Sequence, residues 1–267
     1  MSAATSLGRC GAILFVSLVM LTVGAGLTEA QSISPGTPIY TQYRQPPMED
    51  NRIFYHLLFD QLEGRTNDVE NEFRWHGEAW MGTDFNRLWF KSEGVVERGK
   101  ATDGDTEALY DRPLPFLKYF DGQAGVRYDL DSNPGRTWGA LGLEGLAPYW
   151  FQVEPTFYFS NDDRVAGKFF ATYDLLLTNR LILQPEIEMN FYSKDEPARG
   201  TGSGLSDLDT GLRLRYEFIR DPAFSRKVAP YIGFAYTQTF GDAARFTREE
   251  GGIVHDPRFV YGISVWY

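Results

Sequence analysis

The residues best suited to bind a transition metal are the three histidines, His56, His76 and His255. Imidazole nitrogen is a preferred ligand of copper, zinc, iron and nickel. His56 and His76 occupy polar positions of two neighbouring stretches in which polar and apolar residues alternate, so both are predicted to face one side of a sheet. They are therefore candidate metal ligands. The alternative is that each is hydrogen-bonded within a polar interior.

His255 and the adjacent Asp256 allow a different chemistry, because a histidine oriented by a carboxylate can activate a serine. Ser203 and Ser206 are the candidate nucleophiles for such a hydrolase. The three groups must meet in space. Spacing along the chain does not decide this, so a hydrolase stays an alternative.

Charged residues of both signs alternate with apolar residues over most of the chain after residue 50. In a strand, successive side chains point to opposite faces, so the charges share one face. If the strands form a closed barrel with the apolar face outward, the charged face lines the lumen. The charged residues then form either an ion-pair network that fills and stiffens the lumen or a hydrated path through it. The predicted lumen-facing residues are Arg74, Glu78, Arg87, Lys91, Glu93, Arg127, Asp129, Glu144, Glu154, Lys168, Asp174, Glu186, Glu188, Asp207, Asp209, Arg213 and Arg215.

The elements that must position these side chains are β-strands. The alternation recurs about every ten to twenty residues, with turn residues between the repeats. It predicts an all-β, transmembrane, antiparallel up-and-down β-barrel of about 12 strands, an even number as single-chain bacterial barrels require. The predicted strands are Arg52–Leu62, Glu72–Met81, Phe85–Val96, Thr106–Asp111, Tyr119–Asp131, Thr137–Ala147, Tyr149–Ser160, Arg164–Thr178, Arg180–Lys194, Leu205–Arg220, Val228–Phe240 and Asp256–Tyr267.

The predicted connections alternate in length, as expected for short periplasmic turns and longer outer loops. Two connections, Arg112–Lys118 and Asp221–Lys227, are longer than this rule expects. The tight turns are Gly82–Asp84, Ala147–Pro148 and Thr178–Asn179, and the longer loops are Gly64–Val69, Glu97–Gly104, Ser132–Arg136, Asp195–Gly204 and Gly241–His255.

Alternation alone does not separate a membrane barrel from a soluble one, whose apolar face points inward. Three observations favour lipid: aromatic residues gather near strand ends, the chain begins with an export signal, and it ends in an alternating strand closed by Tyr267. Such a terminal aromatic resembles the signal by which outer-membrane proteins enter their assembly machinery. In lipid every backbone group must be paired, so the last strand is expected to close onto the first.

The chain is expected to comprise a signal peptide over 1–30, a flexible segment over 31–50 and one barrel over 51–267. The first part has a basic residue, an apolar stretch and the sequence Thr28-Glu29-Ala30, which fits a cleavage site. A single membrane-spanning helix is the alternative, although glycines and polar residues shorten its apolar stretch. The segment 31–50 has four prolines and little periodicity.

Composition limits the partners. The net charge of −10 disfavours binding to nucleic acid. The only cysteine, Cys10, precedes the apolar stretch, so the exported chain has no disulfide and no thiolate metal site. Outer-membrane lipid is the expected environment.

Several segments along the whole barrel resemble the outer-membrane copper resistance protein B family. They are DFNRLWFKSEG from Asp84, GVRYD from Gly125, GLAPYWFQVE from Gly145, YDLLLTNRLILQPEIEMN from Tyr173, GSGLSDLDTGLRLRYE from Gly202 and APYIG from Ala229. The resemblance implies an outer-membrane role in copper tolerance, in which copper is bound or passed outward. A periplasmic copper carrier is the expected partner.

The chain departs from this family where metal ligands are expected. Many members carry a Met- and His-rich segment before the barrel, and here residues 31–50 offer only Met48. The candidate copper ligands are thus Met48, His56 and His76. High-capacity copper storage is not expected, and a general outer-membrane pore remains an alternative.

Overall fold

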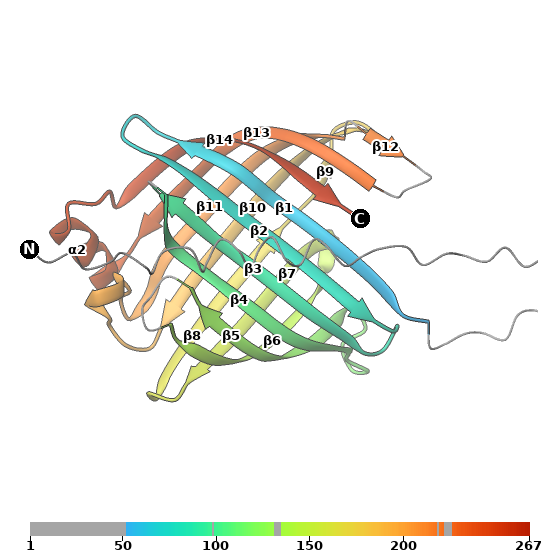
Figure 1. The fold of residues 1–267 in the computed structure, drawn as a ribbon, viewed down its shortest axis with the longest axis horizontal. Coiled ribbons are helices and arrows are strands. Elements are labelled where there is room, and N and C mark those ends of the chain that lie inside the picture. Colours follow the sequence, from blue (N-terminus) through green and yellow to red (C-terminus); the bar gives the residue numbers. More distant parts are fainter. Residues whose placement is uncertain (1–51, 98, 131–134, 218, 222–225) are drawn as a thin grey trace, which may run out of the picture. The chain divides into compact units, whose positions relative to one another are not determined.

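The computed structural model describes residues 52–97, 99–130, 135–217, 219–221 and 226–267. The predicted signal peptide and segment 31–50, with Met48, lie outside them. The described residues form a closed antiparallel barrel of twelve wall strands (Figure 1). The strands are β1 (Phe54–Thr66), β2 (Asn71–Gly82), β3 (Arg87–Glu97), β4 (Lys100–Pro113), β5 (Phe120–Asp129), β6 (Thr137–Ala147), β7 (Phe151–Ser160), β8 (Arg164–Thr172), β10 (Leu181–Tyr192), β11 (Gly204–Tyr216), β13 (Arg226–Thr239) and β14 (His255–Trp266), with two short strands, β9 (Leu175–Leu176) and β12 (Ile219–Asp221).

Each wall strand pairs with its sequence neighbours, β8 with β10 and β11 with β13, and the barrel closes where β1 pairs with β14. At this seam the ring of Tyr261 covers Gly64, where an added Cβ would lie 2.7 Å from the ring. An aromatic ring over a glycine is a recurring way to fill the gap that a curved sheet leaves. The predicted up-and-down barrel is confirmed.

Adjacent residues have opposite exposures, which shows the two faces of the wall. On β7, Phe157 is 57% exposed and Tyr158 is 2% exposed; on β11, Leu212 is 46% exposed and Arg213 is 1% exposed. Large apolar side chains thus point outward, and charged side chains point into the barrel, as the alternation predicts. Among the described residues, no helix combines the length and apolar character needed to cross a membrane.

A β-bulge in β1 explains one wrong prediction. The register shifts between Phe59 and Gln61 against β2 and near the same place against β14. A bulge adds one residue, so the alternation changes parity there. Asp60 lies on the inner side, and so do Glu63 and Arg65 beyond it. The alternation on which the prediction relied is interrupted at this bulge. The residues from Gly64 to Thr66 were therefore predicted to begin a loop, whereas they continue the strand.

Other boundaries also differ from prediction; the strand predicted over Arg164–Thr178, for example, ends at Thr172. The loop predicted over Glu97–Gly104 is a tight hairpin in which Glu97 pairs with Lys100 and Gly99 has φ of 77°. The predicted loop Gly241–His255 contains helix α2 (Gly241–Glu249), whose Ala243 and Phe246 are buried. The strand predicted from Tyr149 begins at Phe151, because a short 3-10 turn, Pro148–Trp150, precedes it.

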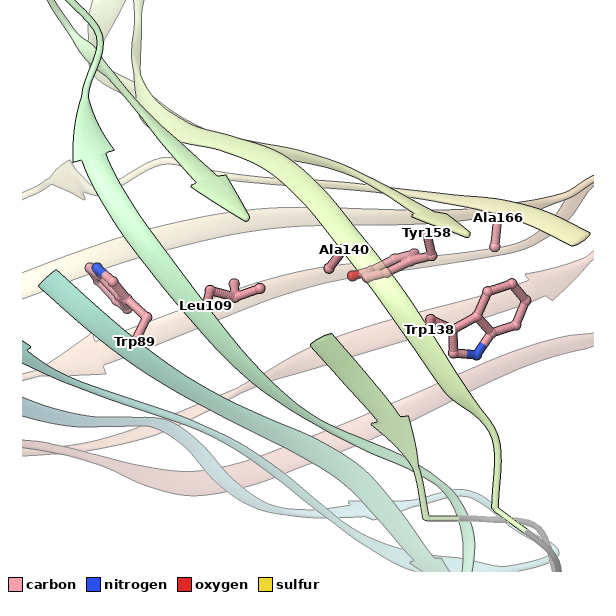
Figure 2. Packing of buried hydrophobic residues seen from close by; sticks show 6 residues of the cluster. All are labelled: Trp89, Leu109, Trp138, Ala140, Tyr158 and Ala166. Carbon is pink, nitrogen blue, oxygen red and sulfur yellow. The ribbon is translucent and has the colours of Figure 1, made fainter. Parts of the chain in front are cut away.

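The inner wall also has an apolar part. Figure 2 shows six of its residues on β3, β4, β6, β7 and β8: Trp89, Leu109, Trp138, Ala140, Tyr158 and Ala166. Two of the aromatic rings pack against lumen cations, with Lys91 Nζ 5.2 Å from the Trp89 ring centre and Arg127 Cζ 4.6 Å from that of Tyr158. Such contacts stabilise a cation beside a ring. Part of the lumen is thus filled by packing rather than water.

Candidate functional site

A network of ion pairs crosses the lumen from β1 to β10 and β11. Arg213 donates two hydrogen bonds of 2.9 Å to Glu63 and lies 3.0 Å from Glu186. Gln61 donates to both carboxylate oxygens of Glu186 at 2.8 Å. Gln61 and Glu63 are fully buried and Arg213 nearly so. We call Gln61, Glu63, Glu186 and Arg213 the ion-pair septum, because they join β1 to strands that are not its neighbours in the sheet.

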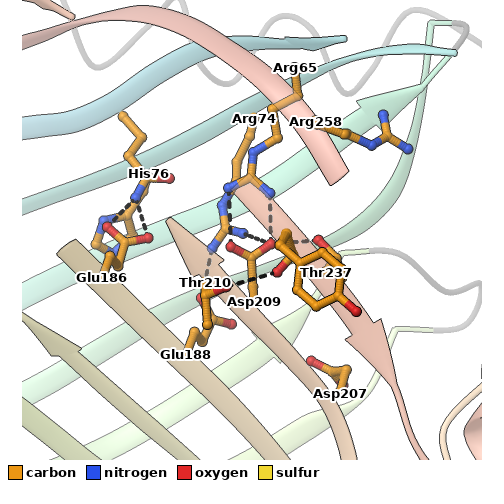
Figure 3. A network of polar contacts seen from close by, with 12 residues as sticks. Arg65, Arg74, His76, Glu186, Glu188, Asp207, Asp209, Thr210, Thr237 and Arg258 are labelled. Carbon is orange, nitrogen blue, oxygen red and sulfur yellow. Dashed lines mark hydrogen bonds and ion pairs between the residues drawn. The ribbon is translucent and has the colours of Figure 1, made fainter. Parts of the chain in front are cut away.

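A second layer of ion pairs lies beside the septum (Figure 3). Arg65 contacts Asp209 at 2.7 Å, and Arg74 contacts Glu188 at 2.7 Å and Asp209 at 3.4 Å. Thr237 donates a further hydrogen bond to Asp209. Every carboxylate here has a short, charge-assisted partner, as buried charges require. Matched charges thus line this part of the lumen.

Three cavities follow the lumen beside these ion pairs. The terminus-end cavity, about 450 Å³, lies where β1 begins and β14 ends, and His56, Asp60 and Glu78 are among its lining residues. The loop-end cavity, about 440 Å³, has Arg65 and Asp209 in its wall. A middle cavity of about 30 Å³ shares lining residues with both. The lumen is therefore wide at its two ends and narrow between them.

Two lysines line the narrow middle cavity. Lys168 forms an ion pair with Glu93. Lys91 contacts Glu144 at 3.0 Å and Glu154 at 2.7 Å. Both lysines form ion pairs with carboxylates of other strands. Because both also line the narrow cavity, a cation moving along the lumen would have to pass beside the two lysines.

The other predicted lumen residues also lie on the inner side. Arg127 contacts Asp129 at 2.9 Å, and Arg87 bonds Asp121 at 2.7 Å. Asp207 accepts a hydrogen bond from Asn190. At the terminus end, Arg215 contacts Asp174 at 2.7 Å and Asp60 at 3.4 Å.

Several inner residues were missed by the sequence analysis. Gln61, Glu63 and Arg65 follow the bulge in β1, which no alternation pattern reveals. Asp60 and the residues on β2, β4 and β14 follow the same alternation that was used elsewhere, so the signal for them was present. The missed inner residues are Asp60, Gln61, Glu63, Arg65, Glu72, Asp105, Glu107, Asp111, Asp256 and Arg258.

The inner face carries an excess of negative charge. The buried charged side chains of the described residues comprise ten carboxylates and five arginines. A lumen with more carboxylates than cations attracts positively charged solutes and repels anions.

The two candidate lumen histidines are not brought together. His56 lies opposite Trp80, whereas His76 lies opposite Gln61. Both line the terminus-end cavity. Within the described part of the chain, no group of three His, Cys, Asp or Glu side chains is arranged to hold a metal ion. The third candidate ligand, Met48, lies outside the described residues.

The candidate hydrolase residues have other partners. His255 Nδ1 lies 3.0 Å from the hydroxyl of Tyr236, and Asp256 accepts a 2.6 Å hydrogen bond from Arg258. Ser206 is 2% exposed, and its hydroxyl accepts a hydrogen bond from the Gly202 N–H. The described groups thus do not form a serine, histidine and aspartate relay.

One further charge cluster ties the loops together. Glu196, in the connection between β10 and β11, accepts hydrogen bonds of 2.8 Å from Arg136 and 2.6 Å from Arg164. The hydrogen bond with Arg136 lowers the pKa of the Glu196 carboxyl below its ordinary value. The cluster joins three connections at the loop end of the barrel.

Comparisons with known proteins identify the family of this chain. The family model described as copper resistance protein B precursor (CopB) matches residues 53–267. "Copper resistance protein B" of Escherichia coli is 40% identical over 220 residues, which cover 82% of this chain and 72% of that protein. "Copper resistance protein B homolog" of Pseudomonas syringae pv. tomato (strain ATCC BAA-871 / DC3000) is 36% identical over 246 residues, covering 89% and 81%.

Among solved structures, the NanC porin in its rhombohedral crystal form matches at a TM-score of 0.48 and 12% identity. The match covers 79% of this chain and 98% of that chain. The KdgM porin matches at a TM-score of 0.43 and 12% identity over the same shares. On the match of the family model over the barrel and the two curated relatives, this chain belongs to the copper resistance protein B family.

Proposed function

We propose that this chain is an outer-membrane β-barrel that protects the cell from copper by binding the ion weakly or by helping to pass it out of the periplasm. Membership of the copper resistance protein B family is the observation that carries the proposal. The acidic inner face supports it, because carboxylates attract a cation.

The outward face supports the membrane location. Phe157, Ile232 and Phe234 are more than half exposed on strands whose alternate side chains are buried. On a soluble protein so large an apolar surface would favour aggregation, whereas lipid covers it. The proposal includes removal of residues 1–30 as a signal peptide, outer-membrane lipid as surroundings and a periplasmic copper carrier as partner at the terminus end.

Transfer fits the lumen better than storage. Storage needs complete sites of several soft or borderline ligands. The candidate ligands Met48, His56 and His76 offer one thioether and two imidazoles, and the two imidazoles lie apart on the wall. Copper is therefore treated as cargo rather than as a resident cofactor, and no catalytic step is proposed.

Deletion of the gene in its own host tests the proposal. We expect lower copper tolerance and higher periplasmic copper, with both restored by the wild-type chain supplied in trans. Unchanged tolerance and unchanged periplasmic copper would contradict a role in copper resistance. Conductance of reconstituted chain in liposomes that shows no preference for metal ions would instead support a general pore.

A further inference from the structure

Glu78 is a buried carboxylate with no hydrogen bond or ion pair of its own among the described residues. It is 8% exposed and lines the terminus-end cavity. No hydrogen bond or ion pair connects it to the residues that the structure describes, although nearly every other lumen carboxylate has one. A buried, unpaired carboxylate is costly. Its position therefore indicates a ligand that the protein itself does not supply.

The cation nearest to Glu78 along the sheet is already engaged. Lys91 lies directly across from Glu78 in the pairing of β2 with β3. Its ammonium group instead contacts Glu144 and Glu154. Three carboxylates thus share one lysine, and Asp60 adds a further negative charge to the same cavity. The surroundings of Glu78 are left with excess negative charge.

Two more groups beside Glu78 lack partners. His76 is two residues away on the same face of β2; its Nδ1 is buried without a hydrogen bond, and its Nε2 reaches only Glu93, at 4.0 Å. Gln61 lies opposite His76 on β1, and its Oε1 is buried and unbonded because its Nε2 donates to Glu186. Alternate residues on one strand lie about 7 Å apart at Cα, close enough for long side chains to share an ion.

We propose that Glu78 and His76, with Gln61 beside them, form a binding site for a divalent transition-metal cation at the inner end of the terminus-end cavity. The assignment rests on the proposed function, since it names the form of copper that the lumen would take. The ligands are a carboxylate, an imidazole and an amide oxygen. Water completes the coordination, which makes the site weak and suited to transfer.

The ligand types select the oxidised ion. Thioether and thiolate ligands favour Cu⁺, whereas imidazole and oxygen ligands suit Cu²⁺, which binds such sites more tightly than Zn²⁺ does. No cysteine or methionine lines the terminus-end cavity among the described residues. The inner site is therefore specific for Cu²⁺ over Cu⁺.

Electron paramagnetic resonance of the full-length folded chain, titrated with Cu²⁺, tests this site. We expect one bound Cu²⁺ with hyperfine coupling to a single nitrogen. His76→Gln should remove the nitrogen coupling, and Glu78→Gln should weaken binding by about tenfold or more. His255→Gln, on the loop side, and Glu249→Gln, on α2, serve as matched controls and should bind as the wild type does.

Glu78→Gln breaks no ion pair, so the barrel should fold, and heat-dependent gel mobility checks its folding. Glu78→Asp, which keeps the carboxylate, is the second variant. The proposal is overturned if His76→Gln keeps the nitrogen coupling, if only His56→Gln removes it, or if Glu78→Gln binds Cu²⁺ as tightly as the wild type. Binding of Cu⁺ at this site as tight as that of Cu²⁺ would overturn the selectivity. Copper tolerance is not the readout of this test, so the site can be absent while the proposed function stands. The chain can likewise bind Cu²⁺ at this site while deletion of the gene leaves copper tolerance unchanged.

Discussion

Arg213 provides the clearest test of how the lumen stabilises the fold. Its side chain is 1% exposed and bonds two carboxylates, Glu63 and Glu186. Arg213→Met keeps most of the side-chain volume and removes the charge. Glu63 would retain Arg65 and the hydroxyl of Tyr231. Glu186 would retain only the amide of Gln61.

The expected cost follows from that imbalance. Removing one partner of a buried ion pair costs about 3–5 kcal/mol, because the remaining charge stays buried without compensation. We therefore expect Arg213→Met to lower the free energy of unfolding by about that amount. Adding Glu186→Gln should recover part of the loss, since it removes the carboxylate that was left unpaired.

Reversible urea unfolding of the chain refolded in lipid vesicles measures this quantity. Arg245→Met is the matched control, because the Arg245 side chain is 57% exposed and pairs with Asp242 on the surface of α2. An exposed pair contributes about 0–1 kcal/mol. If Arg213→Met cost no more than Arg245→Met, the septum would not be a dry ion-pair network, and the reasoning about the lumen would be wrong.

Three further predictions concern the outer face, the middle cavity and the loops. Phe157→Arg should lower the unfolding free energy by about 2–4 kcal/mol, the cost of an arginine on the lipid face near the bilayer centre; a change under about 0.5 kcal/mol in lipid vesicles would contradict a position of residue 157 on the lipid face near the bilayer centre. Lys91→Gln and Lys168→Gln each remove a positive charge from the narrow cavity, so reversal potentials in planar bilayers should shift toward cation selectivity; a shift toward anions would contradict the path. Because the folded pKa of Glu196 is lowered, its stabilising contribution is present above the unfolded value of 4.5 and is lost as pH falls through the folded pKa. The protection of residues 193–203 against hydrogen exchange, measured relative to the intrinsic exchange rate at each pH, should therefore fall at acidic pH, and Arg136→Gln should weaken that pH dependence; equal protection profiles for the two chains would exclude the pairing.

The alternation of residue types predicted the wall of the barrel because a strand between lipid and a polar lumen has a different solvent on each face. Phe157 beside Tyr158 and Leu212 beside Arg213 show this directly. The bulge at Asp60 and Gln61 could not be predicted, since it depends on pairing with β2 and β14 rather than on local preference.

The candidate site was only partly predictable. His76 and Glu78 were both placed on the inner face by alternation. Glu78 has no ion pair of its own because the ammonium group of Lys91 contacts Glu144 and Glu154 instead. Packing across the lumen decides which carboxylates Lys91 contacts, so the sequence could not show it. His56 and His76 were grouped because their strands are adjacent, but the register separates them.

Lipid contact of alternate side chains is the central claim, and spin labels measure it directly. The only cysteine, Cys10, lies in the predicted signal peptide, so single cysteines can be introduced along β7 without interference. Labels at Phe157 and Phe159 should be accessible to oxygen dissolved in lipid and protected from a water-soluble nickel complex. Labels at Thr156 and Tyr158 should show no lipid contact. Access of the nickel complex to a label at Phe157, or lipid contact at both Phe157 and Thr156, would contradict the account.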